Sequence, residues 1–442
     1  MPQAIDTLLN ARWIVPVEPE NQALEQHALA IQDGRILSIL PRAQALARYR
    51  PKLALDLDRH VLLPGLINAH THASMTLLRG LADDLPLMTW LQEHIWPVEA
   101  RWAGADFVRD GALLAMAEML RGGTTCFNDM YMFPDAVADA ARACGIRACV
   151  GLIAFDFPTG YAQTMDEYLA KGLQLHDALR SEPLLHTAFA PHAPYTVSEP
   201  ALAQIGRLAG DLNIPVHIHA HETAAEVARF QAQRGCRPLE RLERLGLLTP
   251  RLVAVHMTQL EPAEIERLAQ AGAHVAHCPE SNLKLASGFC PTARLDAAGV
   301  TVAIGTDGAA SNNDLDMFGE LRTAALLGKG VAGDATVLPA ARVLRMATLN
   351  GARALGLDAE TGSLEPGKSA DLIAVDLEQP ETEPVYHPIS QLVYATGRHQ
   401  VTDAWVAGRR LLAERQLTTL DCADLIRRAR DWRRKITAEH PV

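Results

Sequence analysis

The sequence has little cysteine and no cysteine pattern. Its seven cysteines are an odd number without a Cys-x-x-Cys spacing, which argues against a disulfide framework and against a thiolate zinc site. No uninterrupted apolar run reaches the length of a membrane span. The first residues lack the basic region and apolar core of a secretory signal. We therefore expect a cytoplasmic protein.

The sequence also lacks an excess of basic residues. It has 41 lysines and arginines and 52 acidic residues, for a net charge of −11. This charge gives no sign of a surface that binds nucleic acid or an anionic membrane. An apolar fraction of 48% and a charged fraction of 21% are typical of a globular protein. A chain of 442 residues is long enough for one large and one small domain, or for two ordinary ones.

Both ends of the chain have the pattern of short strands separated by turns. Such strands fit hairpins at the N-terminal end, and a stripe of apolar residues predicts a closing helix over 421–436. We expect a small β-sandwich domain built from both termini, residues 1–63 and 363–442. The strand-like runs lie at 7–17, 28–40, 53–63, 363–377 and 401–412.

Between these ends, eight apolar runs alternate with amphipathic segments. This order predicts a (β/α)8 barrel of the TIM type over residues 64–362. The longest extra segment, 74–102, follows the first strand and is rich in tryptophan and methionine, which favours a lid over a helical insertion that only packs on the barrel. The eight runs are 61–70, 124–128, 148–155, 185–192, 215–221, 252–258, 274–279 and 300–307.

Polar side chains gather where these strands end, which is where a barrel of this type holds its active site. His70 and His72 are two residues apart and so share one face of a strand. Each histidine alone is more typical of a hydrogen-bonded core residue, and Asp307 alone of a turn or helix cap. Together, three histidines and a carboxylate suit a divalent metal with one position left open for water. The residues in question are His70, His72, His192, His217, His219, His221, Glu222, His256 and Asp307.

These motifs resemble those of the amidohydrolase superfamily over nearly the whole chain. The resemblance is carried by His70-x-His72 after a Pro-Gly turn, His219 with Glu222 three residues later, His256, and Gly305-Thr306-Asp307. Within the superfamily the chain is most similar to the 5-methylthioadenosine/S-adenosylhomocysteine deaminases. The supporting stretches are 87–91, 95–99, 279–285 and 308–313.

The resemblance implies one metal ion per subunit. It assigns His70, His72, His219 and Asp307 as ligands, with zinc as the expected metal and iron(II) as the alternative. His217 and His221 are then neighbours of the site.

The resemblance also implies hydrolysis of the 6-amino group of an adenine nucleoside. A bound metal lowers the pKa of a water molecule towards about 7. Asp307 takes the proton of that water and His256 orients the resulting hydroxide as it attacks C6. Glu222 protonates the ring nitrogen N1 and later the departing amine. Ammonia and a 6-oxo base are the expected products.

Substrate contacts are implied in the same way. Glu99 is expected to hold the ribose hydroxyls, and His192 to contact the substrate from the opposite side, with Ser311 as a further contact. Met88, Trp90 and Leu91 are expected to close over the apolar part of the substrate. The alternatives are that Glu99 is a solvated helix-cap charge and that the three apolar residues only pack the insertion.

The expected substrate is 5'-methylthioadenosine. The carboxylate of S-adenosylhomocysteine would favour an arginine, and no arginine here matches the family position, while the segment 155–159 is apolar and acidic. S-adenosylhomocysteine and adenosine remain alternatives, as do a guanine or cytosine deaminase, a chlorotriazine hydrolase, and a scaffold without catalysis. We expect a small-molecule nucleoside as the partner, and the resemblance leaves a homo-oligomer open.

Overall fold

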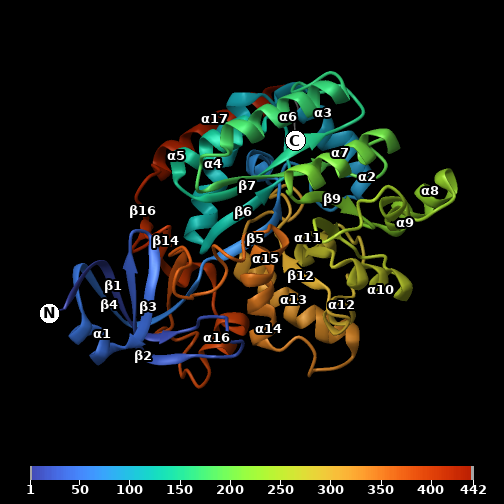
Figure 1. The fold of residues 1–442 in the computed structure, drawn as a ribbon. Coiled ribbons are helices and arrows are strands. Elements are labelled where there is room, and N and C mark those ends of the chain that lie inside the picture. Colours follow the sequence, from blue (N-terminus) through green and yellow to red (C-terminus); the bar gives the residue numbers. More distant parts are fainter. Residues whose placement is uncertain (1, 440–442) are drawn as a thin grey trace.

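Two eight-stranded sheets contain all strands of residues 2–439, the part of the chain that this computed structural model describes (Figure 1). One sheet joins strands from both ends of the chain, in the order β16-β15-β14-β13-β4-β1-β2-β3, and the other is the barrel, in the order β12-β11-β10-β9-β8-β7-β6-β5. The strands of the first sheet are β1 (Gln3–Ile14), β2 (Leu24–Gln32), β3 (Arg35–Pro41), β4 (Tyr49–Pro64), β13 (Leu372–Asp376), β14 (Val401–Val406), β15 (Arg409–Ala413) and β16 (Gln416–Leu417).

The first sheet curls back on itself. Its two halves meet where β4 pairs with β13 in the antiparallel sense. At the β2–β3 turn the carbonyl of Gly34 accepts a hydrogen bond from Ala370, whose carbonyl in turn accepts one from Gly408. Leu29 and Trp405, from opposite halves, are buried in one common apolar cluster. The small β-sandwich predicted from both termini is thus confirmed, and its layers are the two ends of one continuous sheet.

One strand pairing differs from the hairpins expected at the N-terminal end. β1 and β2 form an antiparallel pair, as do β2 and β3, but β4 lies parallel to β1. The chain reaches β4 through the helix α1 (Arg42–Arg48), which begins directly after β3. Parallel neighbours need such a crossover, which a two-residue turn cannot supply.

The second sheet is the predicted TIM-type barrel. All seven of its ladders are parallel, and each of its eight strands is overlapped by one of the eight predicted runs. The first and last strands meet through a side chain: Asn68 Nδ2 donates to Thr306 Oγ1 at 2.7 Å, and the Thr306 amide donates to Asn68 Oδ1 at 3.0 Å. The strands are β5 (Leu66–Thr71), β6 (Thr124–Asp129), β7 (Arg147–Ala154), β8 (Leu185–Pro191), β9 (Val216–Ala220), β10 (Leu252–His256), β11 (His274–His277) and β12 (Thr301–Ile304).

The apolar run 61–70 is divided between the two sheets. β4 ends at Pro64, and β5 begins at Leu66. Gly65 lies so close to the barrel that a Cβ atom there would be 1.9 Å from Oγ1 of Thr125. Only glycine fits this position, so the chain passes from the small sheet into the barrel over a single residue.

Helices surround the barrel (Figure 1), and four short ones, η1, α2, η2 and α3, form the insertion after β5. Within the described residues, no helix combines the length and the apolar character needed to cross a membrane. All seven cysteines are free, as their spacing predicts. The remaining elements are η1 (Ala73–Leu78), α2 (Leu87–Thr89), η2 (Trp90–Ile95), α3 (Trp96–Trp102), α4 (Ala105–Arg121), α5 (Pro134–Cys144), α6 (Met165–Leu179), α7 (Glu199–Leu212), α8 (Ala224–Arg234), α9 (Pro238–Arg244), α10 (Pro262–Ala271), α11 (Pro279–Lys284), α12 (Thr292–Ala297), α13 (Met317–Ala332), α14 (Ala340–Met346), α15 (Leu349–Ala354), α16 (Pro388–Tyr394), η3 (Arg398–Gln400) and α17 (Cys422–Glu439).

The closing helix α17 packs on the barrel. Trp432 Nε1 and Arg428 Nη1 each donate to the carboxylate of Asp110 on α4, both at 2.9 Å. The Trp432 ring also meets the Trp102 ring of α3 edge to face, with the centroids 6.2 Å apart. The division of the chain at residues 63/64 and 362/363 stays a prediction.

A buried ion pair joins the two sheets. Arg147, at the start of β7, donates from Nε to Oδ2 of Asp371 at 2.7 Å and from Nη2 to Oγ of Ser369 at 3.0 Å. The side chains of Arg147 and Asp371 are 3% and 0% exposed. Removing one partner would leave a buried charge without compensation.

We expect the substitution Asp371→Ala to lower the free energy of unfolding by about 3–5 kcal/mol, because the Arg147 guanidinium loses its counter-ion. Urea denaturation followed by circular dichroism measures the loss. The matched control is Glu360→Ala, which removes the partner of Arg35 in an ion pair whose side chains are 53% and 43% exposed, and which should cost less than about 1 kcal/mol. Equal losses in the two variants would contradict the role assigned to burial.

Candidate metal centre and active-site cavity

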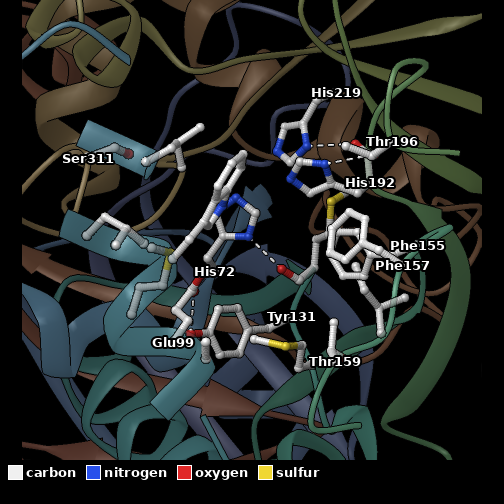
Figure 2. Close-up of a pocket in the computed structure, with 18 of the residues that line it drawn as sticks. His72, Glu99, Tyr131, Phe155, Phe157, Thr159, His192, Thr196, His219 and Ser311 are labelled. Carbon is white, nitrogen blue, oxygen red and sulfur yellow. Dashed lines mark hydrogen bonds between the residues drawn. The ribbon is translucent and has the colours of Figure 1, made fainter. Parts of the chain in front are cut away.

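A cavity of about 710 Å³ opens at the C-terminal ends of the barrel strands. Its wall combines residues that follow the strands with residues of η1, α2, η2 and α3, the helices of the insertion after β5 (Figure 2). Ligand-binding cavities typically measure about 300–1,000 Å³, so a small molecule fits here. The segment predicted to form a lid thus forms part of the cavity wall.

The four predicted metal ligands meet at the floor of this cavity. His70 and His72 come from the end of β5, His219 from β9, and Asp307 from the loop after β12. One ligand atom from each lies within 4.8 Å of all the others. The Nε2 atoms of His70 and His72 are both 3.2 Å from Oδ1 of Asp307. The Nε2 atom of His219 lies 3.2 Å from that of His70.

Hydrogen bonds on the far side of each imidazole orient the three rings. Nδ1 of His72 lies 2.5 Å from the carbonyl oxygen of Met130, and Nδ1 of His219 lies 2.8 Å from that of His192. A carbonyl only accepts, so both Nδ1 atoms carry the proton and both Nε2 lone pairs face the cluster. Nδ1 of His70 has a different partner, the His217 ring, whose Nε2 lies 2.8 Å away.

His217 and His221 lie beside the cluster and are not among its four donors. His217 is fully buried, and its Nε2 contacts Nδ1 of His70, the ring nitrogen of His70 on the side away from the cluster. His221 Nε2 accepts from the amide of Leu239, at the start of α9, at 3.0 Å. His217 and His219 of β9 and His221, which directly follows the strand, therefore have different surroundings although they alternate along the chain.

The electrostatics of the cluster favour a positive charge next to Asp307. Burial lowers the pKa of His70 to about 4. Burial also disfavours a charged His72, but the hydrogen bond and charge of Asp307 outweigh it and raise the pKa of His72 to about 9. Burial would raise the pKa of Asp307, yet its bonds with His70 and His72 hold it well below the usual range. A cation bound here would replace a proton.

The donor set fits a divalent metal ion. Three imidazole nitrogens and one carboxylate oxygen converge in a buried place, their orientations are set by outer contacts, and no thiolate takes part. This is the composition of sites that leave one coordination position open.

Glu222 lies beside the cluster with its proton retained. It follows β9 and lines the cavity. Burial, together with the charge of Asp307, raises the pKa of Glu222 to about 8. Its Oε1 is 3.9 Å from Nε2 of His256. At neutral pH this side chain is therefore a carboxylic acid that can donate a proton into the cavity.

His256 and Asp307 have unusual backbone conformations. Their φ angles are +73° and +62°, in the left-handed region that non-glycine residues rarely adopt. Both residues directly line the cavity. Strained residues of this kind gather at functional sites.

Two consecutive residues of α11 hold these two side chains, and sequence reasoning assigned neither of them a role. Asn282 Oδ1 lies 2.9 Å from Nδ1 of His256, which leaves Nε2 directed towards the cavity. Ser281 Oγ donates to Oδ2 of Asp307 at 2.7 Å. Ser311, predicted to contact substrate, lines the cavity and also donates to Oδ2 of Asp307, at 3.1 Å. The only sequence signal was the stretch 279–285, which supported the family resemblance without a function of its own.

The other predicted substrate contacts are distributed around the wall. Glu99 of α3, Trp90 of η2 and His192 after β8 all line the cavity. Met88 does not: it lines a smaller hollow of about 150 Å³ next to Thr223 and Glu226. Met88 is thus outside the lining of the main cavity, and its expected role over the substrate stays a prediction.

The segment after β7 contributes an apolar wall. Phe155, Phe157 and Thr159 line the cavity (Figure 2), and the two phenylalanine rings lie 4.8 Å apart. Asp156 faces away and accepts from the amide of Ser198 at 2.5 Å. Within the described residues, the lining includes neither lysine nor arginine. The acidic character that the sequence gives this segment is thus absent from the cavity.

Comparison with known proteins agrees with this geometry. Residues 61–411 match the model of the amidohydrolase family. A 5-methylthioadenosine/S-adenosylhomocysteine deaminase of Teredinibacter turnerae is 54% identical over 435 residues, 98% of each chain. A protein of the same name from Moorella thermoacetica is 46% identical over 418 residues, 93% of this chain and 95% of the relative.

Solved structures share the fold over nearly the full length. An adenosine deaminase from Xanthomonas campestris with bound zinc superposes with a TM-score of 0.98 at 56% identity, covering 99% of this chain and 100% of the other. An atrazine chlorohydrolase from Arthrobacter aurescens TC1, complexed with zinc, has a TM-score of 0.89 at 23% identity, covering 96% and 99%; it shows the fold alone. The resemblance predicted from the motifs is confirmed: the chain belongs to the amidohydrolase family, in the branch of proteins named 5-methylthioadenosine/S-adenosylhomocysteine deaminases.

Proposed function

We propose that this protein hydrolytically deaminates the 6-amino group of an adenine nucleoside, with 5'-methylthioadenosine as the favoured substrate. The observation that carries the proposal is the position of Glu222, an acid that keeps its proton at neutral pH, beside a four-donor metal cluster. Relatives with this substrate in their names, similar over 98% of their length, support it. The proposed setting is the cytoplasm, with a small-molecule partner and neither nucleic acid nor membrane.

We propose zinc as the metal, one ion per subunit on His70, His72, His219 and Asp307, with iron(II) as the alternative. The zinc bound to an adenosine deaminase at 56% identity supports this choice. When bound, such a metal lowers the pKa of a water molecule towards about 7 and so provides a nucleophile near neutral pH.

The side chains then have separate tasks. Asp307 accepts a proton from the attacking water, with its Oδ2 held by the hydroxyls of Ser281 and Ser311. His256, fixed by Asn282, offers Nε2 as an acceptor that orients the same water. Glu222 donates its proton to N1 of the purine, which makes C6 electrophilic. The Glu222 carboxylate then transfers the proton of the new C6 hydroxyl to the departing amine, which leaves as ammonia as the 6-oxo group forms, and the proton held by Asp307 returns to Glu222 through solvent.

We propose that the nucleoside is recognised by residues of the cavity wall that do not belong to the metal cluster. An ionised Glu99 can accept hydrogen bonds from both ribose hydroxyls. His192, whose ring lies 5.0 Å from that of Phe155, and Trp90 border the space for the base and the 5' substituent. An uncharged methylthio group suits this apolar wall, whereas the carboxylate of S-adenosylhomocysteine would find no cationic partner in the described lining.

The first test is ammonia release by the zinc-loaded protein on a panel of substrates. We expect kcat/KM for 5'-methylthioadenosine to exceed that for S-adenosylhomocysteine by about tenfold or more, the effect of a charge left unpaired. Adenosine, guanine, cytosine and a chlorotriazine complete the panel. Activity only on a free base or a triazine would keep the fold and metal centre and overturn the nucleoside as substrate.

The substitution Glu222→Gln tests the proton donor. Because glutamine cannot donate a proton to N1, we expect kcat to fall by about 10²- to 10⁴-fold while nucleoside binding persists. In the unsubstituted protein, kcat/KM should decline as the pH rises through about 8, where Glu222 loses its proton. The pH profile of the variant should lack this decline.

The matched control is Glu226→Gln, which changes another buried acid whose pKa burial raises to about 7. It should keep most of the activity. A loss as large as that of Glu222→Gln would show that the local charge, and not the donated proton, matters.

The substitution Asp307→Asn tests the metal ligand. We expect metal affinity to fall by about tenfold or more, since even an outer contact of a metal ligand has an effect of that size, and turnover to be lost. Metal content by mass spectrometry measures the first effect. Asp156→Asn, which alters a carboxylate facing away from the cavity, is the control, and full metal content in Asp307→Asn would refute the assignment.

A further inference from the structure

Glu99 has one direct hydrogen-bond partner in the cavity wall. Tyr131 Oη donates to Oε1 of Glu99 at 2.6 Å, and Figure 2 shows the two side chains meeting at one side of the cavity. Tyr131 is 5% exposed and lines the cavity as Glu99 does. The bond joins two separate elements, because Glu99 belongs to α3 and Tyr131 follows β6 by two residues.

The segment that carries Tyr131 is also tied to the metal cluster. Asp129, the last residue of β6, accepts at Oδ1 from the amide of Ala73 at 2.7 Å. The next residue, Met130, holds Nδ1 of His72 with its carbonyl at 2.5 Å. Tyr131 then holds Glu99. Three consecutive residues therefore connect a metal ligand to the carboxylate proposed for ribose.

The hydrogen bond has a chemical consequence for Glu99. Burial raises the pKa of Glu99, and the bond from Tyr131 acts in the opposite direction, together with the more distant charge of His72. A carboxylate with one oxygen occupied by a fixed donor keeps Oε2 free, along with the second lone pair of Oε1. It can then accept from two neighbouring hydroxyls in a single orientation.

We propose that Tyr131 is a positioning residue that holds Glu99 in the orientation required by the ribose 2' and 3' hydroxyls, and so makes the enzyme select nucleosides over substrates without these groups. The inference rests on the proposed function. Its physical basis is preorganisation: a binding group locked by its neighbours loses less freedom when the substrate binds. Glu99 needs such a contact because α3 is a seven-residue helix outside the barrel strands.

The test compares Tyr131→Phe with the unsubstituted protein on two substrates, 5'-methylthioadenosine and its 2',3'-dideoxy analogue. We expect kcat/KM for 5'-methylthioadenosine to fall by about 10- to 100-fold, the range for a lost hydrogen bond to a charged group, mainly through KM. For the dideoxy analogue the loss should stay below about threefold, since Glu99 has nothing to bind there.

A double-mutant cycle gives the second measurement. In a Glu99→Ala background the substitution Tyr131→Phe should have no further effect, because two residues that act through one contact are not additive. Tyr161→Phe is the matched control, since it removes a hydroxyl from another buried tyrosine that does not line the cavity. The metal content of Tyr131→Phe should equal that of the unsubstituted protein, which excludes damage at His72.

The outcomes separate the two proposals. Equal losses on both substrates, or an undiminished effect of Tyr131→Phe in the Glu99→Ala background, would overturn the role of Tyr131 and leave deamination intact. Absence of ammonia release from every adenine nucleoside by the unsubstituted, metal-loaded protein would instead refute the proposed function.

Discussion

The contact between the Asp307 carboxylate and the imidazoles of His70 and His72 determines the chemistry of the whole cavity. Both Nε2 atoms lie 3.2 Å from the same oxygen, in a place shielded from bulk water. A buried carboxylate with two imidazoles around it is stable only if a positive charge lies next to it. A proton on His72 or a divalent cation provides that charge. The charge of Asp307 also contributes to the raised pKa of Glu222, so the cation site and the proton donor form one electrostatic system.

The sequence predicts the barrel and the place of the metal site because both depend on local pattern, whereas the choice of the four donors among the histidines and acids there depends on the family resemblance. Alternation along a strand places His70 and His72 on one face, and parallel strands bring their carboxyl ends to the same edge. The predicted boundary at 63/64 lies inside the run 61–70, but no polar residue occurs between 61 and 67, so the pattern does not show that the chain changes sheets at Gly65. The parallel pairing of β1 with β4 is hidden for a similar reason, since a short crossover helix looks like a loop between hairpins.

The positioning contacts are beyond sequence reasoning. Tyr131 meets Glu99 across 32 residues, and Asn282 meets His256 across 26. Such pairs come from loops and short helices, whose conformations follow no period and are set by the packing around them.

The position of α17 limits how this protein can be trimmed. Its Trp432 packs against Trp102, which lies three residues after Glu99 in α3, although the two tryptophans are far apart in the sequence. A minimal version that stops where the barrel ends would therefore lose a support of the cavity wall while keeping every metal ligand. The first strand, by contrast, belongs to the small sheet, whose strands contribute no residue to the cavity lining. An affinity handle or immobilisation linker thus belongs at the N-terminus.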